Sequence, residues 1–338
     1  MHQQGFSMPA WGREIAWKER MANPALKKAV PGKKAATTAS IVLAFASVYF
    51  FWGSTYTAIR IGTAQMPALL LAGTRFLIAG AILLAWCRWR GLRLIWPAKM
   101  MLTTSLVGLF LLSGSNVALV YAEKSVPSGL ASLVLQSQSF FTLVLTALWL
   151  KEKWHANQLI GLLLAASGLA LIGSAHGASM PLTGFLLTVA AASMWACGNI
   201  VSRAVGRYGP MNQLAFVVWA SLVPPLPLLA LSAVLEGPAV MATALQSFSA
   251  QSFAAVAYIA WASTLFGYAV WNYLLAHYPV NRIAPFTLLV PLVGLSTGWL
   301  VFGESLQPVH FAGGALLMVG LLVNLFGAPL LARWRLKT

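Results

Sequence analysis

Long apolar runs and short polar connections alternate along most of the chain. A helix needs about 20 apolar residues to cross roughly 30 Å of hydrocarbon, and a helix satisfies its own backbone hydrogen bonds in lipid. The pattern therefore predicts an all-α polytopic membrane protein. Ten transmembrane helices are expected, at 38–60, 66–87, 99–121, 127–150, 156–175, 182–203, 211–234, 252–275, 280–302 and 308–331.

The basic residues test this span count, because cytoplasmic loops of membrane proteins carry an excess of Lys and Arg. With the N-terminus inside, 19 of the 22 basic residues fall in cytoplasmic segments and only Lys124 falls in an outer loop, while Arg60 and Arg75 lie within spans. This asymmetry predicts that both termini are cytoplasmic. Residues 1–37 carry seven of the basic residues and are interpreted as a basic cytoplasmic tail.

The composition agrees with a membrane protein, since 59% of the residues are hydrophobic and only 8% are charged, against about 25% charged in soluble chains. The net charge of +16 lies in the connections and not in a basic stripe, which disfavours a nucleic-acid partner. Cys87 and Cys197 are isolated within apolar runs, so neither a disulfide framework nor a metal site is expected. The sequence indicates no cofactor and no enzyme.

The two halves of the chain resemble each other. An offset of 143 positions superimposes Trp52 on Trp195. An offset of 152 superimposes Tyr121 on Tyr273, Pro127 on Pro279, Glu152 on Glu304, Gly161 on Gly313 and Gly168 on Gly320. The halves predict a five-helix repeat at 38–175 and a second at 182–331, inverted because each holds an odd number of spans. Inverted repeats are typical of secondary transporters with a midplane substrate site; chance similarity between apolar helices is the alternative.

Several motifs carry a resemblance to a known family. They are Trp52-Gly53, Met66-Pro67, Leu71-Ala72-Gly73 with Arg75-Phe76, Gly129 to Gln136 with Gln138 and Phe140 to Thr142, Trp195 to Ile200, Gly267-Tyr268 with Trp271, Ala284-Pro285, Leu288 to Pro291 and Val293 to Leu295. On these residues the chain resembles the EamA family of the drug/metabolite transporter superfamily, over residues 40–328. The third span, with Asn116, and the basic tail match the family poorly.

The resemblance implies a monomeric bacterial inner-membrane exporter of small metabolites, with a central cavity lined by both halves. The chain also resembles bacterial exporters of cysteine and O-acetylserine, which implies export of amino-acid-like substrates. The mechanism predicted for the two halves is alternating access. Broad efflux of aromatic amino acids or drug-like compounds is the alternative, because Trp52, Trp195 and Trp271 would form an aromatic cavity. No Glu lies mid-span, so transport is either facilitated or coupled through a residue that the sequence does not single out.

Polar and aromatic residues within spans are the candidate substrate-binding residues, because polar groups in lipid are costly unless they are buried in the bundle. Helical spacing places pairs of them on shared faces. The predicted binding residues are Trp52, Arg75, Gln136, Ser139, Trp195, Asn199, Tyr268 and Trp271, with Gln138 as a weaker candidate. The alternatives are an interhelical hydrogen bond for Gln136, ordinary packing for the aromatic residues, and a structural anchor for Arg75.

Two prolines interrupt the ninth predicted span. Pro285 and Pro291 free the carbonyl groups of residues 281 and 287, which are expected to meet a polar substrate, while the kinks would act as hinges or as static bends. Ser139 takes the place of Pro291 in the first repeat. The fourth span is therefore expected to lack this kink.

Charged and small residues at other span positions have structural interpretations. Glu152 and Glu304 end the fourth and ninth spans, and each is expected to stabilise the N-terminus of the helix that follows it. Small residues four apart predict close helix contacts, at Gly161 with Ala165 and at Gly294 with Gly298.

Overall fold

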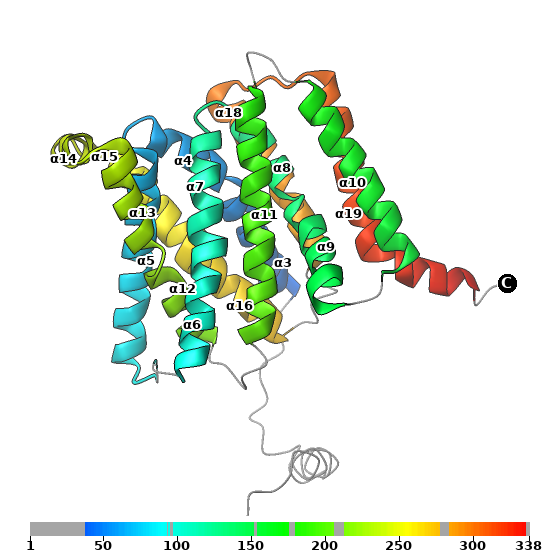
Figure 1. Cartoon of the computed structure of the whole chain (residues 1–338), viewed down its shortest axis with the longest axis horizontal. Coiled ribbons are helices and arrows are strands. Elements are labelled where there is room, and N and C mark those ends of the chain that lie inside the picture. Colours follow the sequence, from blue (N-terminus) through cyan, green and yellow to red (C-terminus); the bar gives the residue numbers. More distant parts are fainter. Residues whose placement is uncertain are drawn as a thin grey trace, which may run out of the picture. The chain divides into compact units, whose positions relative to one another are not determined.

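Nine helices in the described part of the chain are long and apolar enough to span a membrane, and Thr287–Phe302 is a shorter apolar helix at the ninth predicted span. The structure is a computed structural model that describes residues 38–92, 94, 97–151, 154–175, 180–205, 213–277 and 284–335. The predicted tail at 1–37 and Glu152 lie outside the described residues. The prediction of an all-α polytopic membrane protein is confirmed (Figure 1).

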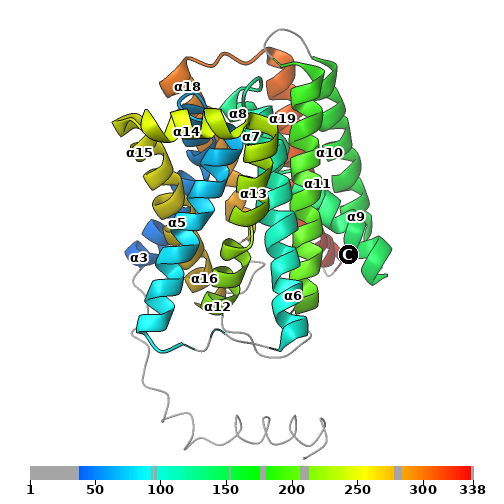
Figure 2. The same ribbon diagram turned by 60° about the vertical axis from the view of Figure 1, so that its left-hand side comes forward.

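The α-helices vary in length because several spans are interrupted. In chain order they are α3 (Thr38–Gly53), α4 (Thr55–Thr63), α5 (Ala68–Trp89), α6 (Ala98–Val107), α7 (Ser115–Ala122), α8 (Ser128–Leu135), α9 (Gln138–Leu150), α10 (Ala156–Ser174), α11 (Leu182–Val205), α12 (Gln213–Leu222), α13 (Pro225–Leu231), α14 (Pro238–Gln246), α15 (Ala250–Ala257), α16 (Gly267–His277), α18 (Val290–Phe302) and α19 (Pro308–Arg335). The non-α segments are the π-helices η1 (Gly108–Gly114), η3 (Ser232–Glu236) and η4 (Tyr258–Phe266), and the 3-10 helix η5 (Ala284–Leu289). In Figure 2, α14 lies across the other helices.

Backbone irregularities recur at the offset of the internal repeat. The π-helix η1 interrupts the third span, and the offset of 152 places its residues on 260–266, inside η4 of the eighth span. The fourth span breaks at residues 136–137, which the same offset places on 288–289, where η5 gives way to α18. The two halves therefore share backbone interruptions as well as residues, and π-segments and broken helices are both frequent at functional sites.

The expectation that the fourth span lacks a kink was wrong. Between α8 and α9 the backbone N–H groups of Gln136, Ser137, Ser139 and Phe140 each donate to the carbonyl three residues earlier, at 2.9–3.1 Å. This tight pattern replaces the α-helical one locally. A proline is therefore not needed to break the helix here.

Four glycines hold the last helix of each half together. An ideal Cβ on Gly161 would lie 2.7 Å from the carbonyl oxygen of Gly320, and one on Gly320 would lie 2.6 Å from that of Gly161. Gly168 and Gly313 make the same reciprocal approach, at 2.5 and 2.7 Å. The offset of 152 places Gly161 on Gly313 and Gly168 on Gly320, so it relates one contact pair to the other, as expected for inverted repeats. Helices α10 and α19 accordingly run side by side (Figures 1 and 2).

We expect Gly168→Ala to destabilise the protein, because its Cβ would meet backbone atoms of Gly313 and Leu317 that have no rotamer freedom. Overpacking of this kind costs about 1–3 kcal/mol. Thermal unfolding of the purified protein in detergent measures the effect. Gly114→Ala is the matched control, since its Cβ finds only ordinary contacts from 3.4 Å. Equal melting temperatures for the two variants would contradict the close contact.

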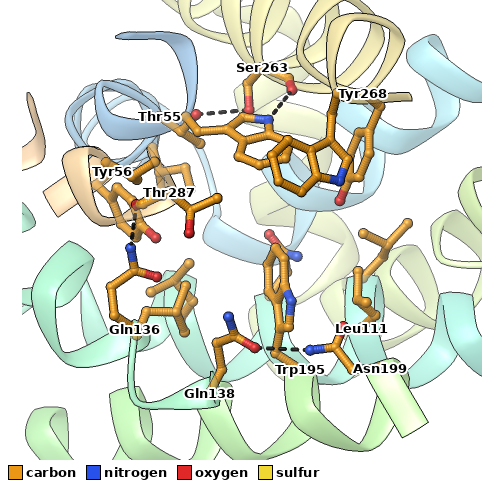
Figure 3. A pocket seen from close by; sticks show the side chains of 18 of the residues that line it. Thr55, Tyr56, Leu111, Gln136, Gln138, Trp195, Asn199, Ser263, Tyr268 and Thr287 are labelled. Atoms are coloured by element: carbon orange, nitrogen blue, oxygen red, sulfur yellow. Dashed lines mark hydrogen bonds between the residues drawn. The ribbon is translucent and has the colours of Figure 1, made fainter. Parts of the chain in front are cut away.

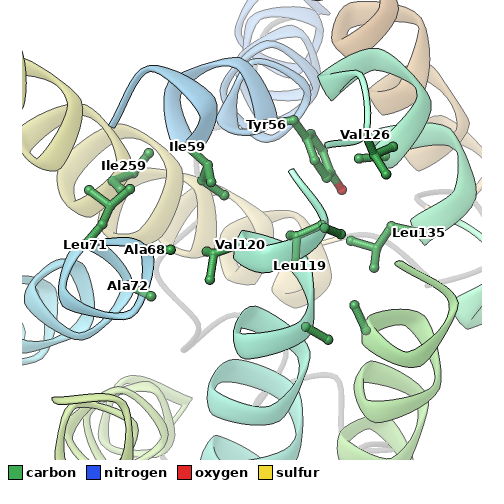
Figure 4. Packing of buried hydrophobic residues seen from close by; sticks show 14 of the residues in the cluster. Tyr56, Ile59, Ala68, Leu71, Ala72, Leu119, Val120, Val126, Leu135 and Ile259 are labelled. Atoms are coloured by element: carbon green, nitrogen blue, oxygen red, sulfur yellow. The ribbon is translucent and has the colours of Figure 1, made fainter. Parts of the chain in front are cut away.

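Three carboxylates gather at one end of the bundle, which we call the carboxylate end and define by the buried Glu123 and the partly buried Glu236 and Glu304. Glu236, at the end of η3, accepts hydrogen bonds from the start of α5, and Glu304, after α18, accepts them from the start of α8. Glu123 caps α7. The largest cluster of buried apolar residues includes side chains from these helix ends (Figure 4). Apolar packing therefore closes the bundle at the carboxylate end.

Candidate functional site

A cavity of about 460 Å³ lies between helices of both halves, and all eight predicted binding residues line it (Figure 3). Its walls come from α3, α4, α5, η1, α7, α8, α9, α11, η4, α16, η5 and α18 and from Gln136 between α8 and α9. The volume falls in the usual range of small-molecule sites, about 300–1,000 Å³. The structure thus brings the candidates together, while their part in substrate binding stays a prediction.

One wall of the cavity is aromatic. The ring centroid of Trp52 lies 5.7 Å from that of Tyr268 and 5.4 Å from that of Trp271, both in edge or tilted arrangements. The indole N–H of Trp52 donates to the carbonyl of Ser263 at 3.1 Å, so it is used within the protein. Trp195, on α11, lies across the cavity from this wall (Figure 3). The two tryptophans that the repeat superimposes thus line the same space.

A network of amides and hydroxyls forms another side of the cavity. The side-chain amide of Asn199 donates to Oε1 of Gln138 at 2.9 Å and to the hydroxyl of Thr142 at 3.1 Å. The Gln138 amide donates in turn to the hydroxyl of Ser139 at 3.2 Å. Gln138, the weaker candidate from the sequence, is therefore the centre of the network. The helix break at 136–137 explains the difference, because helical periodicity does not hold across it.

Gln136 bridges the interruptions of the two repeats. Its Nε2 donates to the carbonyl oxygen of Thr287 at 3.0 Å, the acceptor that Pro291 frees four residues later. In this conformation a side chain of the protein bonds the carbonyl of residue 287, while the contact of this carbonyl with a substrate stays a prediction. Residue 281 lies outside the described residues. The interhelical interpretation of Gln136 is thus realised, and Gln136 lines the cavity as well.

Arg75 lies in the cavity wall with its side chain buried. Its Nε donates to the hydroxyl of Thr264 at 3.1 Å, and Nη1 approaches Oδ1 of Asn116 at 3.5 Å. The Thr264 hydroxyl donates to the carbonyl of Ile259 at 2.9 Å, within η4, so its oxygen is presented to the arginine. These two acceptors serve two of the five guanidinium N–H groups. Arg75 does not bond helix-terminal carbonyls among the described residues, and its remaining donors suit a planar anion.

Glu304 holds three helices together at the carboxylate end. It forms an ion pair with Arg60 of α4. It also accepts from the backbone N–H of Ser128 at 2.8 Å, from the Ser128 hydroxyl at 2.9 Å and from the backbone N–H of Gly129 at 3.0 Å. The expectation that Glu304 stabilises the following helix was wrong, because it caps α8 instead.

The prolines that precede α5 and α8 explain why Glu236 and Glu304 bond the N-termini of these helices. Helices α5 and α8 begin after Pro67 and Pro127, whose side chains carry no acceptor for the first N–H groups of the helix. Glu236 serves α5, accepting from the N–H groups of Leu69 at 3.1 Å and Leu70 at 3.3 Å. Glu304 serves α8 in the same way. Anions at helix N-termini are favoured by the helix dipole.

Several residues that line the cavity were not singled out from the sequence as binding candidates. The polar residues among them are Thr55, Tyr56, Asn116, Thr142, Ser263 and Thr287. Their signal is the same as for the others, a polar side chain within an apolar run, and helical spacing alone does not tell which of these face the cavity. Among the described residues, no group of three or more His, Cys, Asp or Glu is placed to hold a metal ion.

Membrane-spanning helices around a polar and aromatic cavity define a membrane transporter. Its particular family follows from comparison with known proteins, because the EamA-like transporter family matches residues 39–174 and again 182–326. This chain belongs to the EamA-like transporter family. The chain is accordingly a membrane protein that transports a small molecule.

Relatives of known name support the family. The chain is 35% identical over 300 residues to a probable amino-acid metabolite efflux pump of Escherichia coli, covering 85% of this chain and 94% of the relative. It is 38% identical to a pump of the same name from Salmonella typhimurium, covering 83% and 93%. A probable terminal-alkyne amino-acid exporter of Streptantibioticus cattleyicolor is 28% identical, over 80% and 89% of the two chains.

A solved structure shares the fold. It has a TM-score of 0.60 and 21% identity to this chain, and the match covers 89% of this chain and 100% of the other. At this identity the likeness concerns the fold alone.

Proposed function

We propose that this protein exports small amino-acid-like metabolites, such as cysteine or O-acetylserine, across the bacterial inner membrane by alternating access. The relatives named as amino-acid efflux pumps support this substrate class. The proposal includes a monomer with both termini in the cytoplasm and one five-helix repeat at 38–175 facing an inverted one at 182–331. The carboxylate end is then periplasmic.

The observation that carries the proposal is the arrangement of opposite chemistries in one cavity. Arg75 presents a buried cation, which matches the carboxylate of an amino acid. The amide and hydroxyl oxygens of Gln138 and Ser139, together with the aromatic faces of Trp52 and Trp195, provide acceptors and π-surfaces for the ammonium group. A zwitterion is thereby held through both of its charges.

Alternating access has structural support in the interrupted spans. The breaks at residues 136–137 and 288–289 lie at matched positions and meet through the bond between Gln136 and Thr287. Discontinuous helices of two repeats, facing each other at a central site, are the usual framework of alternating access. We expect the halves to rock about this contact, while the apolar cluster of the carboxylate end separates.

Efflux of larger aromatic compounds is the second candidate. The cavity volume of about 460 Å³ lies within the range for drug-sized ligands. The aromatic wall of Trp52, Tyr268 and Trp271 would also stack against a ring. The substrate panel of the first experiment must therefore contain both size classes.

We expect inside-out vesicles that contain the protein to take up radiolabelled cysteine and O-acetylserine saturably. Gln136→Ala should reduce this uptake by about tenfold, because it opens the contact between the two breaks and removes one net hydrogen bond of about 1–1.5 kcal/mol. Ser296→Ala, at an exposed hydroxyl that bonds only its own helix, is the control. Competition by phenylalanine tests the second candidate function, efflux of aromatic compounds. If phenylalanine were transported in preference to cysteine, this second function would replace the first.

A further inference from the structure

Glu123 is a buried carboxylate that lacks the hydrogen bonds formed by Glu236 and Glu304. It directly follows the span Ala98–Ala122 and only 2% of its surface is exposed. Neither carboxylate oxygen has a hydrogen-bond partner among the described residues. Glu236 and Glu304, at the same end of the bundle, each accept several. An ionised carboxylate is costly to bury in this way, so the site favours a carboxyl that holds a proton.

The charges around Glu123 are mixed. It interacts electrostatically with Arg60 and Tyr56 of α4, with Arg75 of α5, and with Glu304 in the segment after α18. Burial raises the pKa of Glu123 well above its usual range, and the negative charge of Glu304 raises it further, while Arg60 and Arg75 lower it. The adjacent Lys124 is occupied elsewhere, with its ammonium 4.6 Å from the ring centre of Tyr121.

Glu123 interacts electrostatically with two groups of residues that would act together in transport. One group is the Arg60–Glu304 ion pair, which links α4, α8 and the end of α18 at the carboxylate end. The other group is Tyr56 and Arg75, which line the cavity. A change of charge at Glu123 is therefore felt by both.

We propose that Glu123 is the proton-binding site of this transporter, and that one proton enters through Glu123 for each substrate molecule that leaves. This inference rests on the proposed function, since it assigns the coupling ion to the same transport cycle. The proton comes from water at the carboxylate end, binds a carboxylate oxygen of Glu123, and leaves to water in the cavity. No bond other than the O–H bond forms or breaks.

The coupling follows from the preference of each conformation for one charge state. When the carboxylate end is closed, Glu123 is buried and its neutral form is favoured, so protonation stabilises the closed state. This stabilisation is present at low pH and is lost as the pH rises through the raised pKa. Ionised Glu123 repels Glu304 and seeks water, so it favours opening.

The test uses the full-length protein in proteoliposomes with an acidic lumen, neutral buffer outside and the membrane potential clamped at zero. Because exchange is one for one, a gradient of one pH unit is expected to concentrate radiolabelled L-cysteine about tenfold inside the vesicles. Exchange of labelled for unlabelled cysteine without a gradient is measured in parallel. Glu123→Gln is expected to abolish the accumulation and to flatten the pH profile of exchange, whereas Glu123→Asp retains both.

Glu236→Gln is the matched control, since it makes the same substitution at the same end of the bundle and is expected to accumulate cysteine as the wild type does. A pH dye in the buffer gives a second readout on the wild type alone, because added cysteine should release protons from the reconstituted protein. If the wild type exchanges cysteine but the gradient drives no accumulation, proton coupling is overturned and the proposed function stands. Accumulation by Glu123→Gln would overturn the assignment to Glu123. Failure of the wild type to exchange cysteine would overturn the proposed function itself.

Discussion

Replacing Arg75 by methionine is expected to lower kcat/KM for an amino-acid substrate by at least about 100-fold, which corresponds to roughly 2.7 kcal/mol. Arg75 is the one buried guanidinium that lines the cavity in the described part of the chain. Truncating one partner of a buried, hydrogen-bonded charge pair costs about 2–5 kcal/mol, in part because the other charge is left unpaired. The substrate carboxylate would be that charge.

Arg75→Lys sharpens this prediction. Lysine keeps the charge but lacks the planar fork that reaches Thr264 and Asn116 together. We therefore expect Arg75→Lys to transport poorly as well, with a raised KM. Initial rates of uptake over a range of concentrations separate KM from kcat, and Arg88→Met, at an exposed residue on the same helix, is the control. A folded Arg75→Met protein with normal kcat/KM would leave Arg75 with a structural role only.

The membrane fold is predictable from the sequence because one physical requirement, a run of about 20 apolar residues, marks each span. The internal repeat is also readable in the sequence, since Gly161 and Gly168 match Gly313 and Gly320 at one offset. The structure gives the reason why these glycines recur. Because glycine has no side chain, the backbones of α10 and α19 are in contact, and a Cβ at any of these positions would clash with a carbonyl oxygen of the other helix.

The interruptions within spans are harder to foresee. The break at residues 136–137 and the π-helix η1 contain no proline, and the local change of hydrogen-bond partner becomes favourable only in the folded bundle. Helical periodicity therefore fails across the break. That failure is why Gln138 ranks behind Gln136 in the sequence, whereas the structure makes Gln138 the partner of both Asn199 and Ser139.

Carboxylates at the span ends show the same limit. Glu123 lies in a polar connection of the sequence, which predicts exposure, yet the helix ends around it bury it. Glu304 acts on a helix that begins 176 positions away in the chain, so its partner is not readable from its sequence neighbours. Cavity-lining residues that stand within apolar runs are easier to recognise in the sequence, because a polar group in lipid is costly unless it is buried in the bundle.

Replacing Glu304 by alanine is expected to lower the free energy of unfolding by about 2–4 kcal/mol. The substitution removes the cap of α8, for which about 1–2 kcal/mol is typical, and leaves the N–H groups of Ser128 and Gly129 without their acceptor. It also unpairs Arg60. Chemical or thermal unfolding of the purified protein in detergent measures the loss.

Glu304→Gln separates the cap from the charge. The N–H groups of Ser128 and Gly129 bond different oxygens of Glu304, and glutamine keeps only one acceptor oxygen. We therefore expect Glu304→Gln to retain one of these two hydrogen bonds and to cost about 1–2 kcal/mol, less than alanine. The Arg60 side chain is 38% exposed, so solvent screens the ion pair, and a double-mutant cycle with Arg60→Gln should give a coupling of about 0.5–1 kcal/mol. If Glu304→Ala were no worse than Glu304→Gln, the cap would contribute nothing. The ion pair alone would then have to close the carboxylate end, and Arg60→Gln should be as damaging as Glu304→Ala.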